Sequence, residues 1–401
     1  PNSSATYNQK AFQISTSLYV NYGLGATVRM TGDWTVWSLY IHGGSTSDTE
    51  AEANVLDTNG YSLTVNGTLI LGLSNIAYPN DYQGKILLKN GTHRIVGELK
   101  TAGQYTHGYA ELGSGTVLVG GNIDYRYATV RPQTSTVILN KTSGTGSINS
   151  GTGAAYSVFY NLTQSGAGAW TVSGSNLQVG NNVNLLTGAG MFDTAKYDKN
   201  VTVLGNATMD NTQVDMGDGT WTVAGNWDSL HVTTFNRNAS RVVLAGSGKT
   251  ILPGTTSATM LNILAISGAV TTAGGFNVTT LIVGGTLTVD HAIGGNSVTT
   301  STQITGTGVI QGVSGVNTRN LSPFSAGGRI TSAVLNIRLN GTMAAGTYES
   351  ALVTIDDYSA NGYTRTFEAG NFVFTGDTVF QYTGTNTFTL DLATNNPNME
   401  F

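Results

Sequence analysis

Short apolar triplets, separated by turns rich in glycine and asparagine, recur along most of this chain. Neighbouring triplets in a run lie roughly 20 residues apart, which is too short for a strand–helix–strand unit and suits one turn of a β-solenoid. Because successive residues of a strand face opposite ways, each triplet directs one or two side chains inward. A single turn, or rung, cannot bury that face alone, so the pattern predicts rungs that stack. The triplets include Val117-Leu118-Val119, Val137-Ile138-Leu139, Val201-Thr202-Val203, Trp221-Thr222-Val223, Val242-Val243-Leu244 and Leu281-Ile282-Val283.

The pattern also repeats at longer range. The stretch from Gly113 to Ile148 resembles the stretch from Gly217 to Ile251 in its glycines, its apolar triplets and its acids, and Asp124 matches Asp228. Such self-similarity is the signature of a repeat architecture. An aspartate that recurs together with its turn is expected to cap that turn with its carboxylate.

This rhythm divides the chain into three parts. Residues 1–31 lack it and predict an N-terminal cap or exchange arm, residues 32–315 carry the solenoid, and residues 316–401 form a C-terminal β region with longer and more aromatic strands. The last part is either a continued solenoid or a small β-sandwich. The first part alternates like a half-buried strand, which either covers the first rung or adds to the sheet edge of another copy. The residues expected to make that assembly contact are Phe12, Ile14, Leu18, Tyr19, Val20 and Tyr22.

The composition agrees with an all-β protein. Only 10% of the 401 residues are charged, and glycine alone supplies 53. Disordered chains lack the regular β-branched clusters seen here, and hydrophobic residues reach 39%. Glycine, threonine, asparagine and serine are poor helix formers. The predicted fold is therefore an all-β parallel β-helix, or β-solenoid, of roughly 20-residue rungs.

Charge and residue usage exclude several classes of partner and site. The net charge is −5 and the lysines and arginines are scattered, so no basic stripe predicts nucleic-acid binding. No apolar run is long enough for a membrane span. The absence of cysteine excludes zinc–thiolate sites and thiol nucleophiles. The chain begins at Pro1, which indicates a processed chain or a fragment, and removal of a secretion signal would agree with an extracellular location.

Three motifs carry a resemblance to a known family. They are WTVAGNW at Trp221–Trp227, SRVVLAGSGKTI at Ser240–Ile251 and NGTLILG at Asn66–Gly72. Over residues 32–315 the chain resembles the parallel β-helix (pectin-lyase-like) stalks of microbial surface proteins, adhesins and phage fibres. Such solenoids serve as stalks, fibres, spikes and polysaccharide-cleaving enzymes, so the resemblance implies a fold and leaves the activity open.

One acidic stretch is a candidate metal site. Asp48, Glu50, Glu52 and Asp57 are either solvated loop acids or ligands of calcium, because flexible loops with oxygen donors suit that ion. Calcium is the only cofactor that the sequence leaves open. A polysaccharide-cleaving β-helix needs carboxylates gathered on one sheet face, and the sequence shows no acids that recur one rung apart.

Aromatic residues and histidines have less specific signals. Trp34, Trp170 and Trp221 each begin a W-T-V triplet and predict core stacking, whereas Trp227 follows a Gly-Asn turn and either packs inside or stacks against an exposed sugar. The five histidines are dispersed without the spacing of metal ligands, so each is expected at the surface or in a turn. Candidate N-glycosylation sites in turns are Asn66, Asn90, Asn140, Asn206 and Asn238.

Together these patterns predict a non-catalytic structural protein of an extracellular, cell-surface or virion appendage, such as a fibre, sheath or spike. Its expected partners are copies of itself, joined through ends or flanks. Two alternatives remain: a β-helix enzyme that cleaves polysaccharide, like a phage depolymerase, and an adhesin that binds surface glycans.

Overall fold

The computed structural model describes residues 6–20, 25–43, 50–72, 83–101, 108–150, 159–210, 212–254, 260–318 and 328–338, together with shorter stretches up to residue 400. These shorter stretches are 342–343, 346–357, 364–367, 371–374, 377–382, 389–391 and 398–400. The chain forms two compact units. The first comprises Pro1–Gly205 and Asp210–Gly217, and the second comprises Asn206–Met209 and Asp218–Phe401.

Both units are built from strands, and the described residues contain no α-helix. Two 3-10 helices, η1 (Glu50–Glu52) and η2 (Ala195–Tyr197), lie in the first unit. The strands of the first unit are β1 (Thr6–Gln9), β2 (Phe12–Val20), β3 (Thr27–Met30), β4 (Trp34–Ile41), β5 (Asn54–Asp57), β6 (Leu63–Val65), β7 (Leu69–Leu71), β8 (Gly84–Leu87), β9 (Thr92–Ile95), β10 (Leu99–Thr101), β11 (Gly108–Glu111), β12 (Thr116–Val119), β13 (Ile123–Asp124), β14 (Ala128–Arg131), β15 (Thr136–Leu139), β16 (Thr145–Asn149), β17 (Asn161–Gln164), β18 (Ala169–Ser173), β19 (Leu177–Val179), β20 (Val183–Leu185), β21 (Phe192–Asp193), β22 (Val201–Val203) and β24 (Gln213–Asp215).

The second unit continues in strands, with β23 (Ala207–Asp210) lying almost entirely within it. Its other strands are β25 (Thr220–Val223), β26 (Trp227–His231), β27 (Thr234–Asn236), β28 (Arg241–Leu244), β29 (Lys249–Leu252), β30 (Leu261–Ile266), β31 (Ala269–Val283), β32 (Thr286–Gly306), β33 (Val309–Thr318), β34 (Arg329–Arg338), β35 (Thr342–Met343), β36 (Gly346–Asp357), β37 (Thr364–Phe367), β38 (Asn371–Phe374), β39 (Asp377–Tyr382), β40 (Thr389–Asp391) and β41 (Asn398–Glu400).

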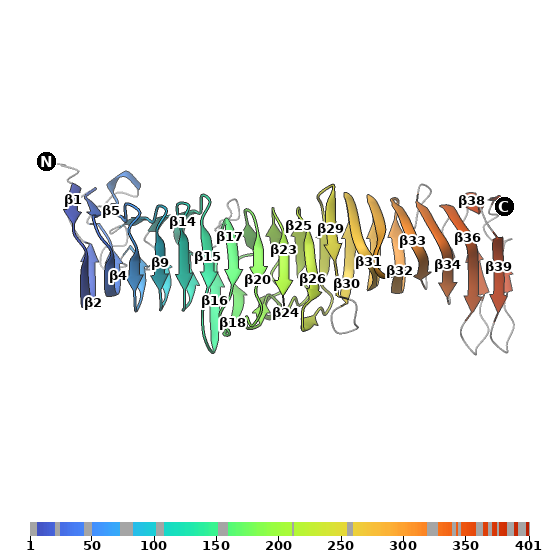
Figure 1. Cartoon of the computed structure of the whole chain (residues 1–401), viewed down its shortest axis with the longest axis horizontal. Helices are drawn as coiled ribbons and strands as arrows, with labels where there is room; N and C mark the ends of the chain where they lie inside the picture. The colour runs from blue at the N-terminus through green and yellow to red at the C-terminus, as the bar shows by residue number, and fades with distance from the viewer. Residues whose placement is uncertain are drawn as a thin grey trace. The chain divides into compact units, whose positions relative to one another are not determined.

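The strands pair in parallel from rung to rung, as Figure 1 shows for each unit. Val117 is in register with Val137 in the first unit, and Val242 with Leu264 in the second, so these rungs repeat every 20 to 22 residues. Parallel pairing at that spacing, without helical crossovers, is a β-solenoid. The predicted all-β solenoid of roughly 20-residue rungs is confirmed.

The core of each unit is a set of inward columns that run from rung to rung. Val117, Val137 and Leu162 form one such column in the first unit, and all three are fully buried. Trp221 and Val242 do the same in the second unit. Each inward residue thus packs on its counterpart in the next rung. Because side chains alternate along a strand, each apolar triplet contributes some of its side chains to the core.

The first unit carries an additional sheet of six strands, in the order β1-β3-β5-β8-β11-β14. This extra side lengthens the rungs there: Trp34 pairs with Leu63 and Thr64 with Arg94, spacings of 29 and 30 residues. The N-terminal residues 6–20 belong to this arrangement, because β1 pairs in parallel with β3 and β2 with β4. They therefore form the first rung of the stack.

Parallel pairing also continues in the second unit beyond the internal repeats. β33 pairs with β34, β34 with β36, and β36 with β39. Between the two choices that the sequence left open for this region, the backbone pairing is that of a solenoid and not of an antiparallel sandwich.

Asparagine side chains link the corners of neighbouring rungs, where no strand ladder is present. The side-chain oxygen of Asn122 accepts a hydrogen bond from the Ser147 N–H at 3.0 Å, and that of Asn176 accepts one from the Asn200 N–H at 3.0 Å. In the second unit Asn226 accepts from the Thr250 N–H at 2.9 Å. Each bond gives a protein partner to a backbone donor in or just before a strand, where the preceding rung offers an asparagine side chain in place of a strand carbonyl.

Aspartates close several of the turns from within. The carboxylate of Asp124 accepts from the Arg126 N–H at 3.2 Å, and that of Asp228 from the Leu230 N–H at 3.1 Å. The predicted turn-capping role is confirmed for Asp124, whose bond closes the turn after β13, whereas Asp228 makes the same local bond within β26. The bond of Asp124 makes an Asx turn, in which a carboxylate takes the place of a backbone acceptor.

Candidate functional site

The first rung is the part of the structure on which the predicted assembly residues lie. Phe12, Ile14 and Leu18 face inward on β2 but stay half-buried, whereas Val20 is buried and Tyr19 is 55% exposed. Tyr22 lies outside the described residues. Phe12, Ile14, Leu18 and Val20 are in register with four inward residues of β4 in the next rung, all of which are at most 2% exposed: Trp34, Val36, Leu39 and Ile41. At this end of the described structure, the inward columns are therefore open at their first members, Phe12, Ile14 and Leu18.

The backbone of this rung is also unpaired at the end of the stack where the inward columns are open. In the described part of the chain, β1 pairs with β3 alone and β2 with β4 alone, so each has one unpaired edge. Exposed aromatic side chains flank that edge: Tyr19 stacks on Tyr40 with ring centroids 4.6 Å apart, and Trp37 is 55% exposed. An unpaired edge beside exposed aromatic groups is a surface on which another strand can add.

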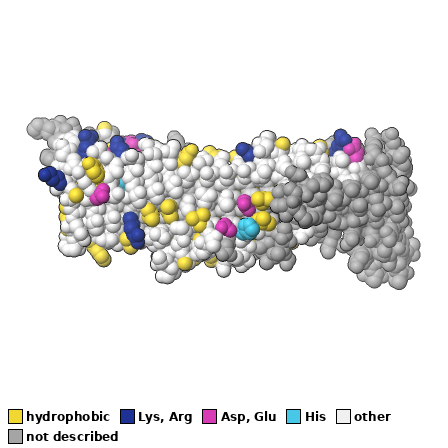
Figure 2. All heavy atoms as spheres, viewed as in Figure 1, with side chains coloured by type: hydrophobic (Ala, Val, Ile, Leu, Met, Phe, Trp, Pro, Cys, Tyr) yellow, Lys and Arg dark blue, Asp and Glu magenta, His cyan; other side chains and the backbone are white. Residues whose placement is uncertain are grey.

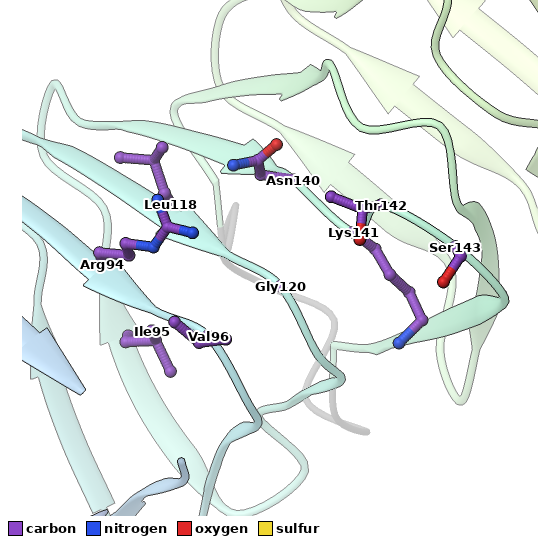
Figure 3. Close-up of a pocket in the computed structure, with 9 residues that line it drawn as sticks. All are labelled: Arg94, Ile95, Val96, Leu118, Gly120, Asn140, Lys141, Thr142 and Ser143. Atoms are coloured by element: carbon purple, nitrogen blue, oxygen red, sulfur yellow. The ribbon is translucent and has the colours of Figure 1, made fainter. Parts of the chain in front are cut away.

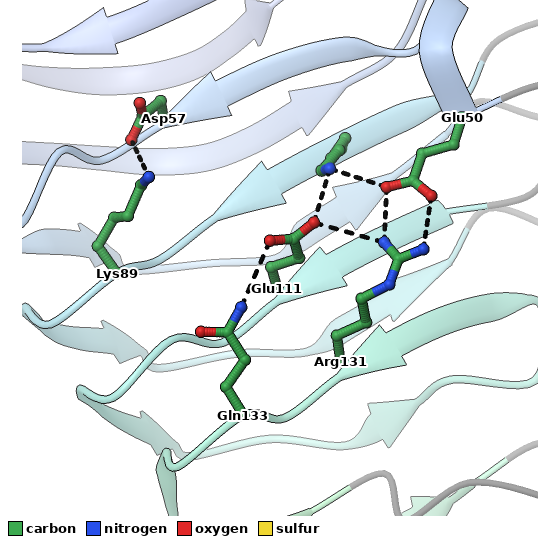
Figure 4. A network of polar contacts seen from close by, with 7 residues as sticks. Glu50, Asp57, Lys89, Glu111, Arg131 and Gln133 are labelled. Atoms are coloured by element: carbon green, nitrogen blue, oxygen red, sulfur yellow. Dashed lines mark hydrogen bonds and ion pairs between the residues drawn. The ribbon is translucent and has the colours of Figure 1, made fainter.

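A network of alternating charges covers the outer face of the six-stranded sheet (Figure 4). Glu50, at the start of η1, reaches Lys85 on β8 at 2.8 Å and Arg131 on β14 at 2.6 and 2.7 Å. Glu111 on β11 contacts the same two cations, at 2.7 Å from Lys85 and 3.4 Å from Arg131. The network ties η1 to three successive rungs.

These contacts shift the ionisation of the groups involved. The hydrogen bond from Arg131 is the main reason why the pKa of the Glu50 carboxyl falls to about 2, and Lys85 adds to it against the effect of burial. Burial by itself would lower the pKa of Lys85, but hydrogen bonds to Glu111 and Glu50 outweigh it and raise the pKa. The contacts thus hold Glu50, Lys85 and Arg131 in their charged forms at neutral pH, with each cation beside a carboxylate.

Within the predicted calcium stretch, the described carboxylates have cations or N–H groups as partners. Glu50 belongs to the charge network, and Asp57 lies 3.3 Å from Arg29 and accepts from the Asn59 N–H at 2.9 Å. Figure 4 shows Asp57 with Lys89, apart from Glu50. Asp48 lies outside the described residues, and nothing is known of the Glu52 side chain. Among the described residues, no group of three or more acids or histidines is arranged to hold a metal ion.

One pair of acids does recur one rung apart, contrary to the expectation from the sequence. Asp193 on β21 is in register with Asp215 on β24, and Thr171 on β18 precedes them in the same column. Asp193 is 8% exposed and accepts from the Thr171 hydroxyl at 3.1 Å and from the Ala195 N–H at 2.9 Å. Asp215 accepts from the Gly217 N–H at 3.3 Å. Both carboxylates are thus turn caps.

Two histidines are buried, although the sequence predicted surface or turn positions for all five. His42 is 4% exposed and His93 fully buried, so the expectation that every histidine is a surface or turn residue is wrong for these two. His231 is exposed, and nothing is described of the His107 or His291 side chains. His93 is inward because it alternates with exposed neighbours on β9. The signal in the sequence was Ile95, an apolar residue two positions further on the same strand, which alternation places on the same face as His93.

The tryptophans mostly follow the core prediction. Trp34, Trp170 and Trp221 are buried, as predicted from their triplets. Trp227 is also fully buried, which excludes the exposed sugar-stacking role. Its indole N–H donates to the Ser229 hydroxyl at 2.9 Å, and its ring meets that of Trp221 edge-on at 5.9 Å. The corner at Gly225-Asn226 redirects the chain, so the alternation restarts with Trp227 inside.

The candidate glycosylation residues lie at corners. Asn66, Asn90, Asn206 and Asn238 are exposed, and Asn140 is half-buried. The Asn206 side-chain oxygen already accepts from the Asn226 N–H at 2.8 Å. Figure 2 shows charged side chains in isolated positions or small groups on the described surface, with uncharged atoms between them.

Comparisons with known proteins add no relative. No protein-family model, no curated protein and no solved structure matches the chain. Nowhere in the part of the chain that the structure describes is there a helix capable of crossing a bilayer.

Proposed function

We propose that this chain is a non-catalytic structural protein of an extracellular or virion appendage, and that copies of it associate through the first rung. The observation that carries the proposal is the open inward column: Phe12, Ile14 and Leu18 are half-buried, while their counterparts one rung further are buried. Burying apolar surface is the main driving force for association, and an open column has a geometry that only another stacked rung matches.

The unpaired edges of β1 and β2 support the same partner. A strand from a second copy that adds there gains a ladder of backbone hydrogen bonds and covers the half-buried column at once. The charge network of Glu50 and Arg131 joins η1 to β8, β11 and β14, none of which is an edge strand of the first rung, and its charges are already paired (Figure 4). The edge rung itself carries one charged group among its described residues, Lys10, so repulsion between copies is small.

Negative-stain electron microscopy and sedimentation velocity, over a wide range of protein concentration, test this proposal. The variant Ile14→Lys places a charge in the open column, which is a device that natural edge strands use against pairing. Leu204→Lys is a matched control, because Leu204 is 53% exposed at a corner away from the first rung. We expect wild type and Leu204→Lys to form regular oligomers or filaments with rising concentration, and Ile14→Lys to remain monomeric.

A second pair of variants separates the aromatic flank from the column. Tyr19→Lys changes an exposed residue beside the edge, and Tyr197→Lys changes a tyrosine of similar exposure elsewhere, 48% against 55%. Only Tyr19→Lys is expected to weaken association. Particles that stay single at every concentration, or variants that assemble equally well, would contradict the proposal.

Polysaccharide cleavage is the rival function, and one observation favours it. Asp193 and Asp215 stand in register on adjacent strands, and glycosidases use two neighbouring carboxylates that flank the scissile bond. Their capping bonds give both a structural role as well. Reducing-sugar release from acidic and neutral polysaccharides, compared between wild type and Asp215→Asn, tests this alternative. Release by wild type that is lost in the variant would replace the structural proposal.

A further inference from the structure

A cavity on the outer surface of the first unit has the chemistry of a binding site that the assembly edge does not use. Its volume is about 220 Å³, and it lies across β9, β12 and the turn that follows β15 (Figure 3). Arg94 and Val96 form one side, and Leu118 with the Gly120 backbone lies between them and the turn residues Asn140 and Lys141.

Gly120 lines the depression at a corner where the packing of adjacent rungs requires glycine. A Cβ at that position would collide with the Val96 carbonyl oxygen of the preceding rung, so the corner cannot carry a larger residue without a shift of the backbone. Leu118 is half-exposed and Val96 is 40% exposed, so apolar surface faces the cavity. The space is thus fixed by packing between rungs.

The charge of the cavity is one-sided. Arg94 and Lys141 line it, and no acidic residue does. Within the described residues neither cation takes part in an ion pair, whereas Lys85, Arg126 and Arg131 are all paired with carboxylates. Arg94 on β9 is in register with Leu118 on β12 and, through it, with Ile138 on β15, two strand spacings or about 10 Å away. Lys141 lies three residues beyond Ile138, in the turn after β15, so it approaches the cavity from the far side.

Three kinds of contact therefore meet in one place. The guanidinium and ammonium groups suit an anion, Leu118 and Val96 suit an apolar face, and the Asn140 amide with the Thr142 and Ser143 hydroxyls suits hydroxyl groups. We propose that this cavity binds an anionic saccharide unit, a sugar ring that carries a carboxylate, sulfate or phosphate group. A sugar ring combines a C–H face, several hydroxyls and, here, one acid.

The size of the cavity sets the extent of recognition. Sites for drug-sized ligands occupy about 300–1,000 Å³, so about 220 Å³ accommodates one ring or its acidic substituent and not a whole oligosaccharide. A longer saccharide chain with more than one acidic group would engage both cations. Two cations are too few for the phosphate neutralisation that nucleic-acid binding needs.

Isothermal titration calorimetry tests the site, with full-length protein from a host that does not N-glycosylate, so that Asn140 is unmodified. The probes are oligosaccharides of equal length that bear uronate, sulfate or phosphate, a neutral oligosaccharide, and a glutamate-rich peptide. We expect at least one acidic oligosaccharide to bind at least tenfold more tightly than the neutral one, and more weakly as salt is raised. The three acidic probes identify which acid the site prefers.

Charge-removing variants connect the binding to the cavity. Arg94→Gln and Lys141→Gln are each expected to weaken binding at least fivefold, and the double variant further. Arg241→Gln is a control with no expected effect, because Arg241 is an exposed cation in the second unit. Circular dichroism of each variant checks that the fold is retained. The inference is overturned if no acidic sugar binds, if the neutral sugar or the peptide binds equally well, or if the double variant binds like wild type.

Discussion

Acidification provides a direct test of how the interior of this solenoid treats a titratable group. His93 is fully buried in the inward column on β9, in register with Val117. Its Nε2 lies 2.6 Å from the Leu88 carbonyl oxygen, so the neutral ring donates there, while the buried Nδ1 has no hydrogen-bond partner among the described residues. Protonation would place a charged N–H at Nδ1 without an acceptor. Burial accordingly lowers the pKa of His93 to about 4, and the bond to Leu88 opposes this only in part.

The effect on stability follows from linkage. Between pH 6.5 and about 4 the unfolded chain binds a proton at His93 that the folded chain does not, so stability falls as the pH is lowered through this range. One pKa unit corresponds to about 1.4 kcal/mol, so the full loss is about 3 kcal/mol, of which about 2 kcal/mol is reached at pH 5. Above pH 7 the contribution is constant.

Hydrogen exchange measured by mass spectrometry suits this test, because a solenoid opens locally and a single global unfolding energy is poorly defined. Protection of the peptide that spans residues 84–101, corrected for the intrinsic pH dependence of exchange, is compared at pH 7.5 and pH 5. The matched variant is His93→Gln, whose amide can still donate to Leu88 and does not titrate. Wild type should lose about 2 kcal/mol more protection than the variant. Equal losses, or a native His93 that titrates near 6.5 by NMR, would refute the reasoning.

Three further outcomes are expected. Arg131→Gln should lower the stability of the first unit by at most about 1 kcal/mol, because the ion pair with Glu50 is partly exposed. Unfolding followed by circular dichroism measures this loss, which should shrink in high salt. In wild type the ion pair persists down to about pH 2, where the pKa of Glu50 lies, and is lost below it. Asn226→Ala should cost about 1 kcal/mol and speed exchange of the Thr250 amide, with unchanged exchange in the first unit as the control. Gly113→Ala should destabilise the first unit by more than about 1 kcal/mol, because Gly113 has φ +68° and a Cβ there would collide with the Lys89 carbonyl. A thermal unfolding midpoint equal to that of wild type would contradict this prediction.

The repeating pattern of the sequence determined the architecture and most of the core. In Trp221-Thr222-Val223 the outer two residues are inside because strands alternate, and this holds wherever a triplet stands in a strand. The capping role of Asp124 could also be inferred, since an Asx turn is a local interaction between residues two apart. Local rules were sufficient for these features.

Only the tertiary structure decided which distant residues share a column or a face. Glu50 and Arg131 are 81 residues apart in sequence, and Asp193 meets Asp215 because the intervening turns bring them into register. The burial of Trp227 depends on where the preceding corner restarts the alternation. Arg94 and Lys141 come to line one cavity through two strand pairings and a glycine that no larger side chain can replace without a backbone shift. Which residues of neighbouring rungs are in register depends on the turn lengths and corner geometries between them. An alternation of period two within each strand does not determine that pairing.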